Sequence, residues 1–306
     1  MISGFMIVKN VLKQGYPFVE AIAAALPICD EFLISDGYST DGTFEIIDRM
    51  TKSNSKIKVF REEWPNEKKW SILAQVTNSL RKKCKHDYIF SIQANEVIHE
   101  ESVDYIKSLP QIFPDVHTFS FPFWQLVQVF KLSEDFRLRL SKNLDGIIAT
   151  GDAWTLGPSK SFVRMEVLKR MRNPRTLSRY FSRGVQWTYA DACSNPTSRA
   201  VYLPKPVFRY WSLFPLNYLE KTAGHAELFD LAGHYRLIEM LKPLVDNPSE
   251  FWAAVLHWAN FGINYPVKFA AVDAKVHPKL IQELILNTGV KRYYVREEVL
   301  DLIKGL

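Results

Sequence analysis

The first hundred residues repeat one pattern, in which a short apolar run is followed by a stretch whose apolar side chains have helical spacing. The apolar runs occupy residues 2–8, 31–35, 56–60 and 88–92. Helices are predicted between them, over residues 18–26, 44–50 and 68–83. Connections of this length allow neighbouring runs to pair in parallel through right-handed crossovers. The order therefore predicts a doubly wound α/β sheet over residues 1–100.

Polar residues follow three of these runs, at the point where each strand is expected to end. They are Val8-Lys9-Asn10, Ser35-Asp36-Gly37 and Gln93-Ala94-Asn95-Glu96. Ligands of open α/β sheets bind beyond the carboxyl ends of the strands, so we expect all three groups on one rim. Asp36 can present its carboxylate to a ligand there. Asp-Gly is also ordinary turn chemistry, and Thr40 or Asp41 can cap the next helix.

The regular alternation stops beyond about residue 105. Strand-like segments are predicted at residues 119–121 and 137–140, and the pattern becomes helical from about residue 206. We expect residues 1–205 to form one domain around the sheet and residues 206–306 to form a mostly helical C-terminal extension. The extension carries an apolar stripe of Trp252, Leu256 and Ala259, which is typical of a packed helix face.

The charge of the chain excludes one class of partner and favours another. The formal net charge is +6, but the basic residues are spread out and form no long tail, so no nucleic-acid partner is predicted. A mildly basic protein suits an anionic small molecule such as a nucleotide. The three cysteines lie far apart, and no apolar run approaches the ~18 residues that span a bilayer. We therefore expect a cytoplasmic protein.

Several acidic residues are candidates for chemistry. A carboxylate such as Glu96 at a strand end can bind a divalent cation through oxygen, and the cation would offset the charge of a diphosphate. Its neighbour Asn95 offers only a neutral carbonyl oxygen. Asp152 and Asp191 follow predicted β segments in loops, and either can act as a general base. A lone histidine near an apolar run, such as His99, is more often structural.

Taken together, these segments resemble the family 2 glycosyltransferases, the inverting nucleotide-sugar enzymes with the GT-A fold. The most specific match is "DEFLISDGYSTDGTFEII" at residues 30–47, which resembles the family's second strand and the turn after it. The resemblance is strong over residues 1–105, patchy over residues 106–225 and absent beyond. Other matching segments are "IVKN" at 7–10, "TNSL" at 77–80, "QANEVIHE" at 93–100, "GDA" at 151–153 and "VFRYWSLFPLNYLEK" at 207–221.

The resemblance implies a GT-A-like, Rossmann-like fold, with a mostly parallel sheet flanked by helices. It implies that Asp36 binds the base or ribose of a nucleotide, in a pocket lined by Val8, Asn10 and Asn78. Gln93, Asn95 and Glu96 occupy the family's metal motif, which implies Mg²⁺ or Mn²⁺ as cofactor. The base that deprotonates the acceptor hydroxyl would be Asp191, with Asp152 as its rival.

Two residues depart from the family's pattern. Arg209 stands where a histidine is usual, just before Tyr210. Asn95 replaces an aspartate that even the "QADEVIHE" subgroup retains. Because carboxylate charge supplies most of a site's attraction for Mg²⁺ or Mn²⁺, the exchange weakens a hard-cation site. Metal dependence and turnover are both left open by this change.

The sequence thus predicts a hexosyltransferase-like glycosyltransferase that moves a sugar from a nucleoside-diphosphate sugar to an acceptor hydroxyl with inversion. The alternative is a non-catalytic nucleotide- or sugar-binding protein of the same fold with a degenerate metal motif. A nucleotidyltransferase is less favoured, because no glycine-rich loop follows the first strand. The helical extension could bind the acceptor, a second subunit in a homo-oligomer or a membrane face, and the sequence does not choose among these.

Overall fold

A single large sheet runs through the molecule, in the order β3-β2-β1-β4-β7-β6-β11-β5. The computed structural model describes residues 1–65, 71–151, 153, 155–163, 165, 197–229, 232–261, 270–287 and 290–306. The first half of the sheet pairs entirely in parallel. It consists of β3 (Ile57–Arg61), β2 (Glu31–Asp36), β1 (Ile2–Val8) and β4 (Tyr88–Ser91). The predicted α/β sheet over residues 1–100 is confirmed.

Helices cover both faces of this parallel half, which explains why β1 and β2 are buried along almost their whole length, whereas the edge strand β3 has exposed positions. The connections are α1 (Phe18–Ala25), α2 (Thr43–Ser53) and α3 (Ser71–Arg81). Successive residues of a strand point to opposite faces. Accordingly Phe5 packs in a cluster with Leu80 of α3, whereas its neighbour Met6 packs in a second cluster with Ile22 of α1.

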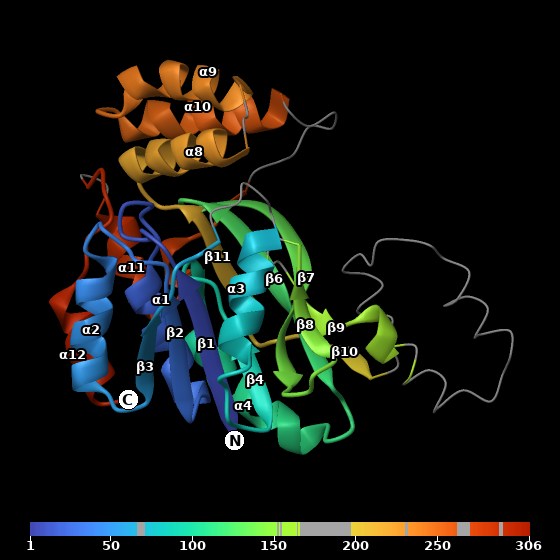
Figure 1. The fold of residues 1–306 in the computed structure, drawn as a ribbon. Coiled ribbons are helices and arrows are strands. Elements are labelled where there is room, and N and C mark those ends of the chain that lie inside the picture. Colours follow the sequence, from blue (N-terminus) through green and yellow to red (C-terminus); the bar gives the residue numbers. More distant parts are fainter. Residues whose placement is uncertain are drawn as a thin grey trace, which may run out of the picture.

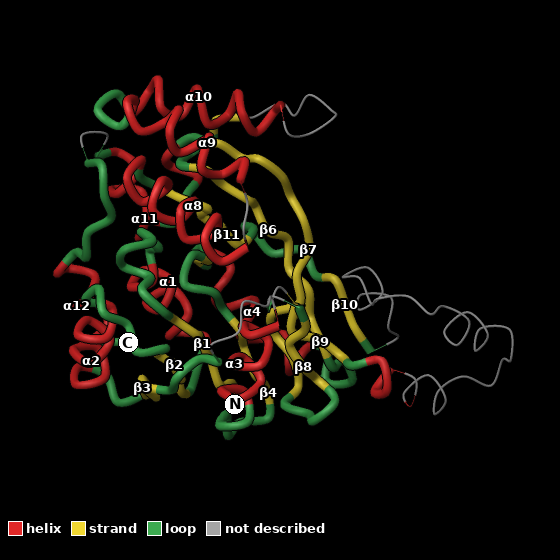
Figure 2. Tube along the Cα trace, turned by 45° about the horizontal axis from the view of Figure 1, so that its top comes forward, coloured by secondary structure: helices red, strands yellow, loops and turns green. Residues whose placement is uncertain are grey.

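The second half of the sheet is mixed and curled. β7 (Phe130–Lys142) pairs antiparallel with both β4 and β6 (Thr118–Val127), and β11 (Val207–Ser212) runs parallel to β6. β5 (Glu96–Val97) pairs antiparallel with β11 at the far edge. Figure 2 shows the long strands β6 and β7 bending together away from the flat part of the sheet. Smaller elements here are α4 (Val103–Ile112), β8 (Ile147–Thr150), β9 (Thr155–Pro158), β10 (Ser198–Ala200), β12 (Ala270–Ala271) and the 3₁₀ turns η1 (Leu26–Ile28) and η2 (Glu100–Ser102).

Three helices form a separate layer across the carboxyl ends of the parallel strands (Figure 1). They are α8 (Pro215–Phe229), α9 (Ala232–Leu241) and α10 (Pro248–Phe261), with the 3₁₀ turn η3 (Lys242–Leu244) between the last two. Their shared core includes Leu241, Phe251 and Trp252, so Trp252 is packed as its place in the apolar stripe predicts. Within the described residues, no helix combines the length and the apolar character needed to cross a membrane.

The last described segment returns to the parallel half of the sheet. α11 (Lys279–Leu286) and α12 (Glu297–Lys304) pack against α1 and α2. Glu20 of α1 is fully buried, accepts a 2.8 Å hydrogen bond from the Tyr293 hydroxyl and lies 3.3 Å from the Arg296 guanidinium. These contacts link residues more than 270 positions apart in the sequence.

A buried histidine fastens β11 to the returning chain. His277, just after the 3₁₀ turn η4 (Ala274–Val276), is fully buried, and its Nδ1 lies 2.8 Å from the Tyr210 hydroxyl. Burial lowers the pKa of His277 to about 4, an effect that the nearby Asp273 carboxylate only partly opposes. Between about pH 4 and pH 6.5 the folded protein therefore holds this ring neutral, whereas an unfolded chain would protonate it.

This histidine predicts a loss of stability in mild acid. Its folded pKa lies below its unfolded value of about 6.5, so the stabilisation is present above that value and is lost as the pH falls toward 4. Through this group the wild type should lose roughly 2 kcal/mol of unfolding free energy between pH 7 and pH 5. We expect His277→Gln, which cannot titrate, to lack that part of the loss. Urea titrations at both pH values measure this, with exposed His257→Gln as control. Equal pH dependence in wild type and His277→Gln would contradict the assignment.

Candidate functional site

The first two polar groups meet at the ends of β1 and β2. Val8 and Asp36 are register partners, and the Gly37 amide donates a 2.9 Å hydrogen bond to the Val8 carbonyl. Asn10 adopts a left-handed backbone conformation with φ 53°. Its side-chain oxygen accepts a 2.8 Å hydrogen bond from the amide of Thr40. The structure thus brings Val8, Asn10 and Asp36 together on one rim.

A fixed cation already faces the Asp36 carboxylate. Asp36 is fully buried, accepts from the Ser39 amide and lies 3.2 Å from Nε of Arg61. The Arg61 guanidinium is held between two rings, 4.7 Å from the centroid of Tyr38 and 3.9 Å from that of Phe44. Arg61, at the end of β3, was not among the residues that the sequence singled out. Its position after an alternating strand is the signal that would have found it.

The third polar group forms a tight turn between β4 and β5, and its asparagine is held by the neighbouring strand. The Asn95 side-chain nitrogen donates a 2.9 Å hydrogen bond to the Tyr210 carbonyl. The Tyr210 amide in turn donates to the Asn95 carbonyl at 2.9 Å. Asn95 is only 3% exposed. An asparagine is suited to this position because an aspartate could not donate to Tyr210.

Glu96 is engaged by an arginine. Both of its oxygens accept from Arg139, at 2.9 Å from Nε and 2.7 Å from Nη2, and both side chains are fully buried. Nε of Arg209 lies 3.8 Å from the same carboxylate. Burial would raise the pKa of Glu96, but the charges of Arg139, Arg209 and Arg137 together outweigh burial and lower it. Glu96 is therefore a buried anion that holds Arg139 in place.

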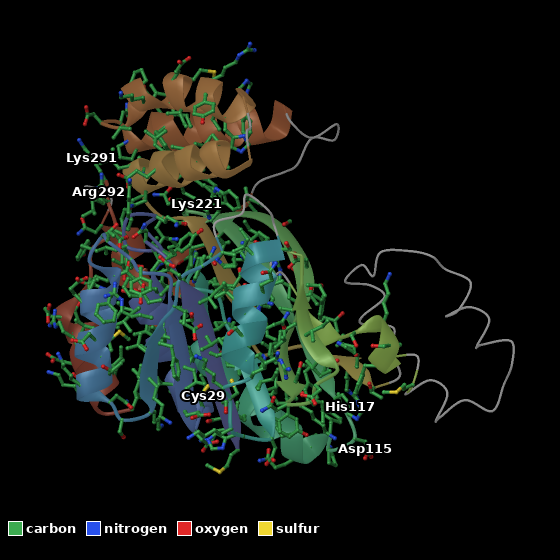
Figure 3. The ribbon with its side chains drawn as sticks, in the orientation of Figure 1. Cys29, Asp115, His117, Lys221, Lys291 and Arg292 are labelled. Carbon is green, nitrogen blue, oxygen red and sulfur yellow. The ribbon has the colours of Figure 1, made fainter. Side chains whose placement is uncertain are left out.

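Glu96 lies among four basic side chains, which we call the basic cluster: Arg137, Arg139, Arg209 and Lys221. Arg209 of β11 donates to the side-chain oxygens of Gln125 at 2.9 Å and Gln93 at 3.4 Å. Lys221 of α8 donates to the Trp211 carbonyl at 2.7 Å, and its ammonium lies 3.6 Å from the Trp211 ring centroid. Figure 3 shows Lys221 where α8 meets the carboxyl edge of the sheet, far from Cys29 at the opposite edge.

The charges in this cluster repel one another. Burial, followed by the charge of Arg137, lowers the pKa of Arg209. Burial and the charge of Arg209 hold the pKa of Lys221 well below its usual range. The fourth member, Arg137, is fully buried and lies 2.8 Å from the Asp135 carboxylate. The cluster thus gathers four basic side chains, with Glu96 and Asp135 as carboxylates that contact it among the described residues.

A divalent cation does not fit the predicted metal residues as they are arranged. Both oxygens of Glu96 face Arg139, the Asn95 amide is bound to Tyr210, and Gln93 faces Arg209. Across the part of the chain that the structure describes, no group of three or more His, Cys, Asp or Glu side chains could hold a metal ion. A cation at this point would also lie close to buried guanidinium groups of like charge.

The remaining predicted residues lie elsewhere. Asn78 joins α3 to β8, because its side chain donates to the Ala149 carbonyl at 2.9 Å and accepts from the Ala149 amide at 2.8 Å. His99 accepts from the Glu101 amide at 3.2 Å, which is a capping contact. Asp152 and Asp191 lie outside the described residues. Their roles and that of Asn78 in nucleotide binding stay predictions.

Comparison with known proteins gives matches only among solved structures. No family model and no curated protein matches this sequence. S. aureus TarS is 12% identical, with 93% of this chain and 53% of that chain covered and a TM-score of 0.37. This chain therefore spans about half the length of that structure.

Two further structures belong to shorter chains. S. aureus TarS 1–349 in complex with UDP-GlcNAc is 12% identical, with 99% of this chain and 89% of that chain covered and a TM-score of 0.37. The mannosyltransferase PcManGT from Pyrobaculum calidifontis, in complex with GDP-Man and Mn²⁺, is 13% identical, with 82% of each chain covered and a TM-score of 0.37.

The Asn95 contacts predict that restoring an acid destabilises the fold. We expect Asn95→Asp to lower the unfolding free energy by about 2–4 kcal/mol, because a buried carboxylate would then face the Tyr210 carbonyl without a hydrogen to donate. We also expect no gain of Mn²⁺ binding. Denaturant titration and calorimetry with Mn²⁺ measure the two effects.

A matched control for this exchange is Asn247→Asp. Asn247 is exposed and its side chain accepts a hydrogen bond from the Glu250 amide, a role that an aspartate fills equally well. The control should have the stability of the wild type. An Asn95→Asp protein that is as stable as the wild type and binds Mn²⁺ would show that the asparagine is a weakened metal ligand.

Proposed function

We propose that the protein is a glycosyltransferase that moves a sugar from a nucleoside-diphosphate sugar to an acceptor hydroxyl with inversion. The observation that carries the proposal is the meeting of two features on one edge of the sheet. Asp36, with Asn10 and Ser39, forms a rigid polar turn suited to the nucleoside. The basic cluster beyond β4 and β11 is suited to the diphosphate. Ligands of open α/β sheets bind at this edge, beyond the carboxyl ends of the parallel strands.

The mechanism we propose is a single displacement. A carboxylate base deprotonates the acceptor hydroxyl, and we assign this role to Asp191, with Asp152 as the rival. The oxygen attacks the anomeric carbon from the face opposite the diphosphate, so the configuration inverts. Negative charge develops on the leaving diphosphate, and fixed cations such as Arg209 stabilise it without reorganising. Glu96 acts in this scheme by positioning Arg139.

The acceptor would approach from the layer formed by α8, α9 and α10. This layer lies across the carboxyl ends of the parallel strands, above the proposed donor site (Figure 1). We therefore propose that the C-terminal extension, residues 206–306, contacts the acceptor. Its strand β11 belongs to the sheet.

A second candidate function is a non-catalytic nucleotide-binding protein of the same fold. The observation in its favour is that Asn95 and Glu96 are both engaged by protein groups, Tyr210 and Arg139. Both candidates predict nucleotide binding. Only the enzyme predicts release of nucleoside diphosphate when the protein is incubated with a sugar donor.

The proposal predicts measurable affinity for nucleoside diphosphates. We expect calorimetry with UDP, GDP and their sugars to give a dissociation constant between about 1 µM and 1 mM for at least one of them. Asp36→Asn should weaken that binding by at least ~10-fold, since a charged hydrogen-bond acceptor is lost. The control is Asp48→Asn, which alters a carboxylate of α2 paired with Lys52, away from the rim. No affinity for any nucleotide, with or without Mn²⁺, would exclude both candidate functions.

A further inference from the structure

We propose that the basic cluster, with Arg209 as the residue that contacts ligand, binds the donor diphosphate in place of a divalent cation. This inference rests on the proposed function and assigns the charge partner of the donor. It starts from a disagreement, because the residues at the predicted metal position do not fit a metal ion. Glu96 is bound by Arg139 and Asn95 by Tyr210, so the oxygen ligands that a hard cation needs are already engaged.

The way Arg209 is held supports this assignment. Its position on β11 places it in register with Glu96 of β5 on one side and Gln125 of β6 on the other. The hydrogen bonds that orient its guanidinium go to the amide oxygens of Gln125 and Gln93. Its Nε also lies 3.8 Å from the Glu96 carboxylate, whose two oxygens already accept from Arg139, so the neighbouring groups orient the guanidinium before a phosphate binds.

Lys221 is held in the same manner. Its ammonium donates to a backbone carbonyl, that of Trp211, and lies over the rings of Trp211 and Tyr16 at 3.6 and 4.7 Å. It is 2% exposed, so it acts on a ligand through its charge rather than by contact. A diphosphate next to Arg209 would add a negative charge close to this buried ammonium.

Exposure within the cluster identifies the contact residue. The side chains of Arg137 and Arg139 are fully buried, and they pack over the Phe123 ring. The Arg209 side chain is 11% exposed. Arg139 and Lys221 are therefore too buried to touch a ligand and act on it through their charge, whereas Arg209 can reach a phosphate. Arg61, the other cation on the rim, is stacked between two rings beside Asp36 and belongs to the nucleoside end.

The first test compares metal conditions on the wild-type protein. Calorimetry with UDP and GDP is run in excess EDTA and again in excess Mn²⁺. The cluster predicts dissociation constants that agree within about twofold, and affinity that falls as salt is added. Binding that requires Mn²⁺ and disappears in EDTA would overturn this inference while leaving the proposed function intact. Absence of binding under every condition would overturn both.

The second test removes the contact residue. Arg209→Gln should weaken UDP or GDP binding by ~10- to 100-fold while changing the binding of the free nucleoside little, because only the phosphates lose a charged partner. Arg209→Lys keeps the charge, loses the forked geometry and should be intermediate, which also covers the case in which the glutamine variant does not fold. The matched control is Arg49→Gln. Arg49 is an exposed arginine of α2 that pairs with Glu297 of α12. Wild-type diphosphate affinity in Arg209→Gln would show that the cluster is structural only.

Discussion

The curl of the sheet closes around one ion pair. In the strand order, β6 and β11 lie between β7 and β5, yet Nη2 of Arg139 on β7 is 2.7 Å from the carboxylate of Glu96 on β5. The pair therefore bridges the inside of the curl, where both side chains are fully buried. Removing one partner from such a pair leaves an uncompensated buried charge, which typically costs ~3–5 kcal/mol. The same carboxylate accepts from the Gln93 amide at 3.1 Å and lies 3.8 Å from Nε of Arg209, so both residues contact the bridge.

The parallel half of the fold could be predicted from the sequence because its signals are local. Its strands are short and mostly apolar, and each connecting stretch has helical spacing, so the strand–helix alternation can be recognised within windows of about 15 residues. The rim followed from topology, since the carboxyl ends of parallel strands meet at one edge. Val8, Asn10 and Asp36 do come together there.

The mixed half and the chemistry of the site depend on contacts that no local window contains. Asn95 could be interpreted as a weakened metal ligand because its partner, Tyr210, lies 115 positions later in the sequence. Arg139, the partner of Glu96, lies 43 positions later. The alternation Arg137-Leu138-Arg139 indicates a strand, but it does not show which residues that strand contacts. β11 likewise begins where the sequence pattern becomes helical, and it joins the sheet only through long-range pairing with β6 and β5.

The contacts made by residues 293–303 also bear on the order in which the chain can fold during synthesis. Glu20 lies on α1 and Asn54 caps the carboxyl end of α2, but their buried polar groups are satisfied by Tyr293, Arg296 and the Ile303 carbonyl. A ribosome adds ~5–20 residues per second, so these groups wait many seconds for their partners. Until then the Glu20 carboxylate of α1 lacks Arg296, the cation that it faces in the folded protein. The parallel half therefore cannot be fully stable on its own. Completion of this part of the fold therefore requires translation as far as residue 303.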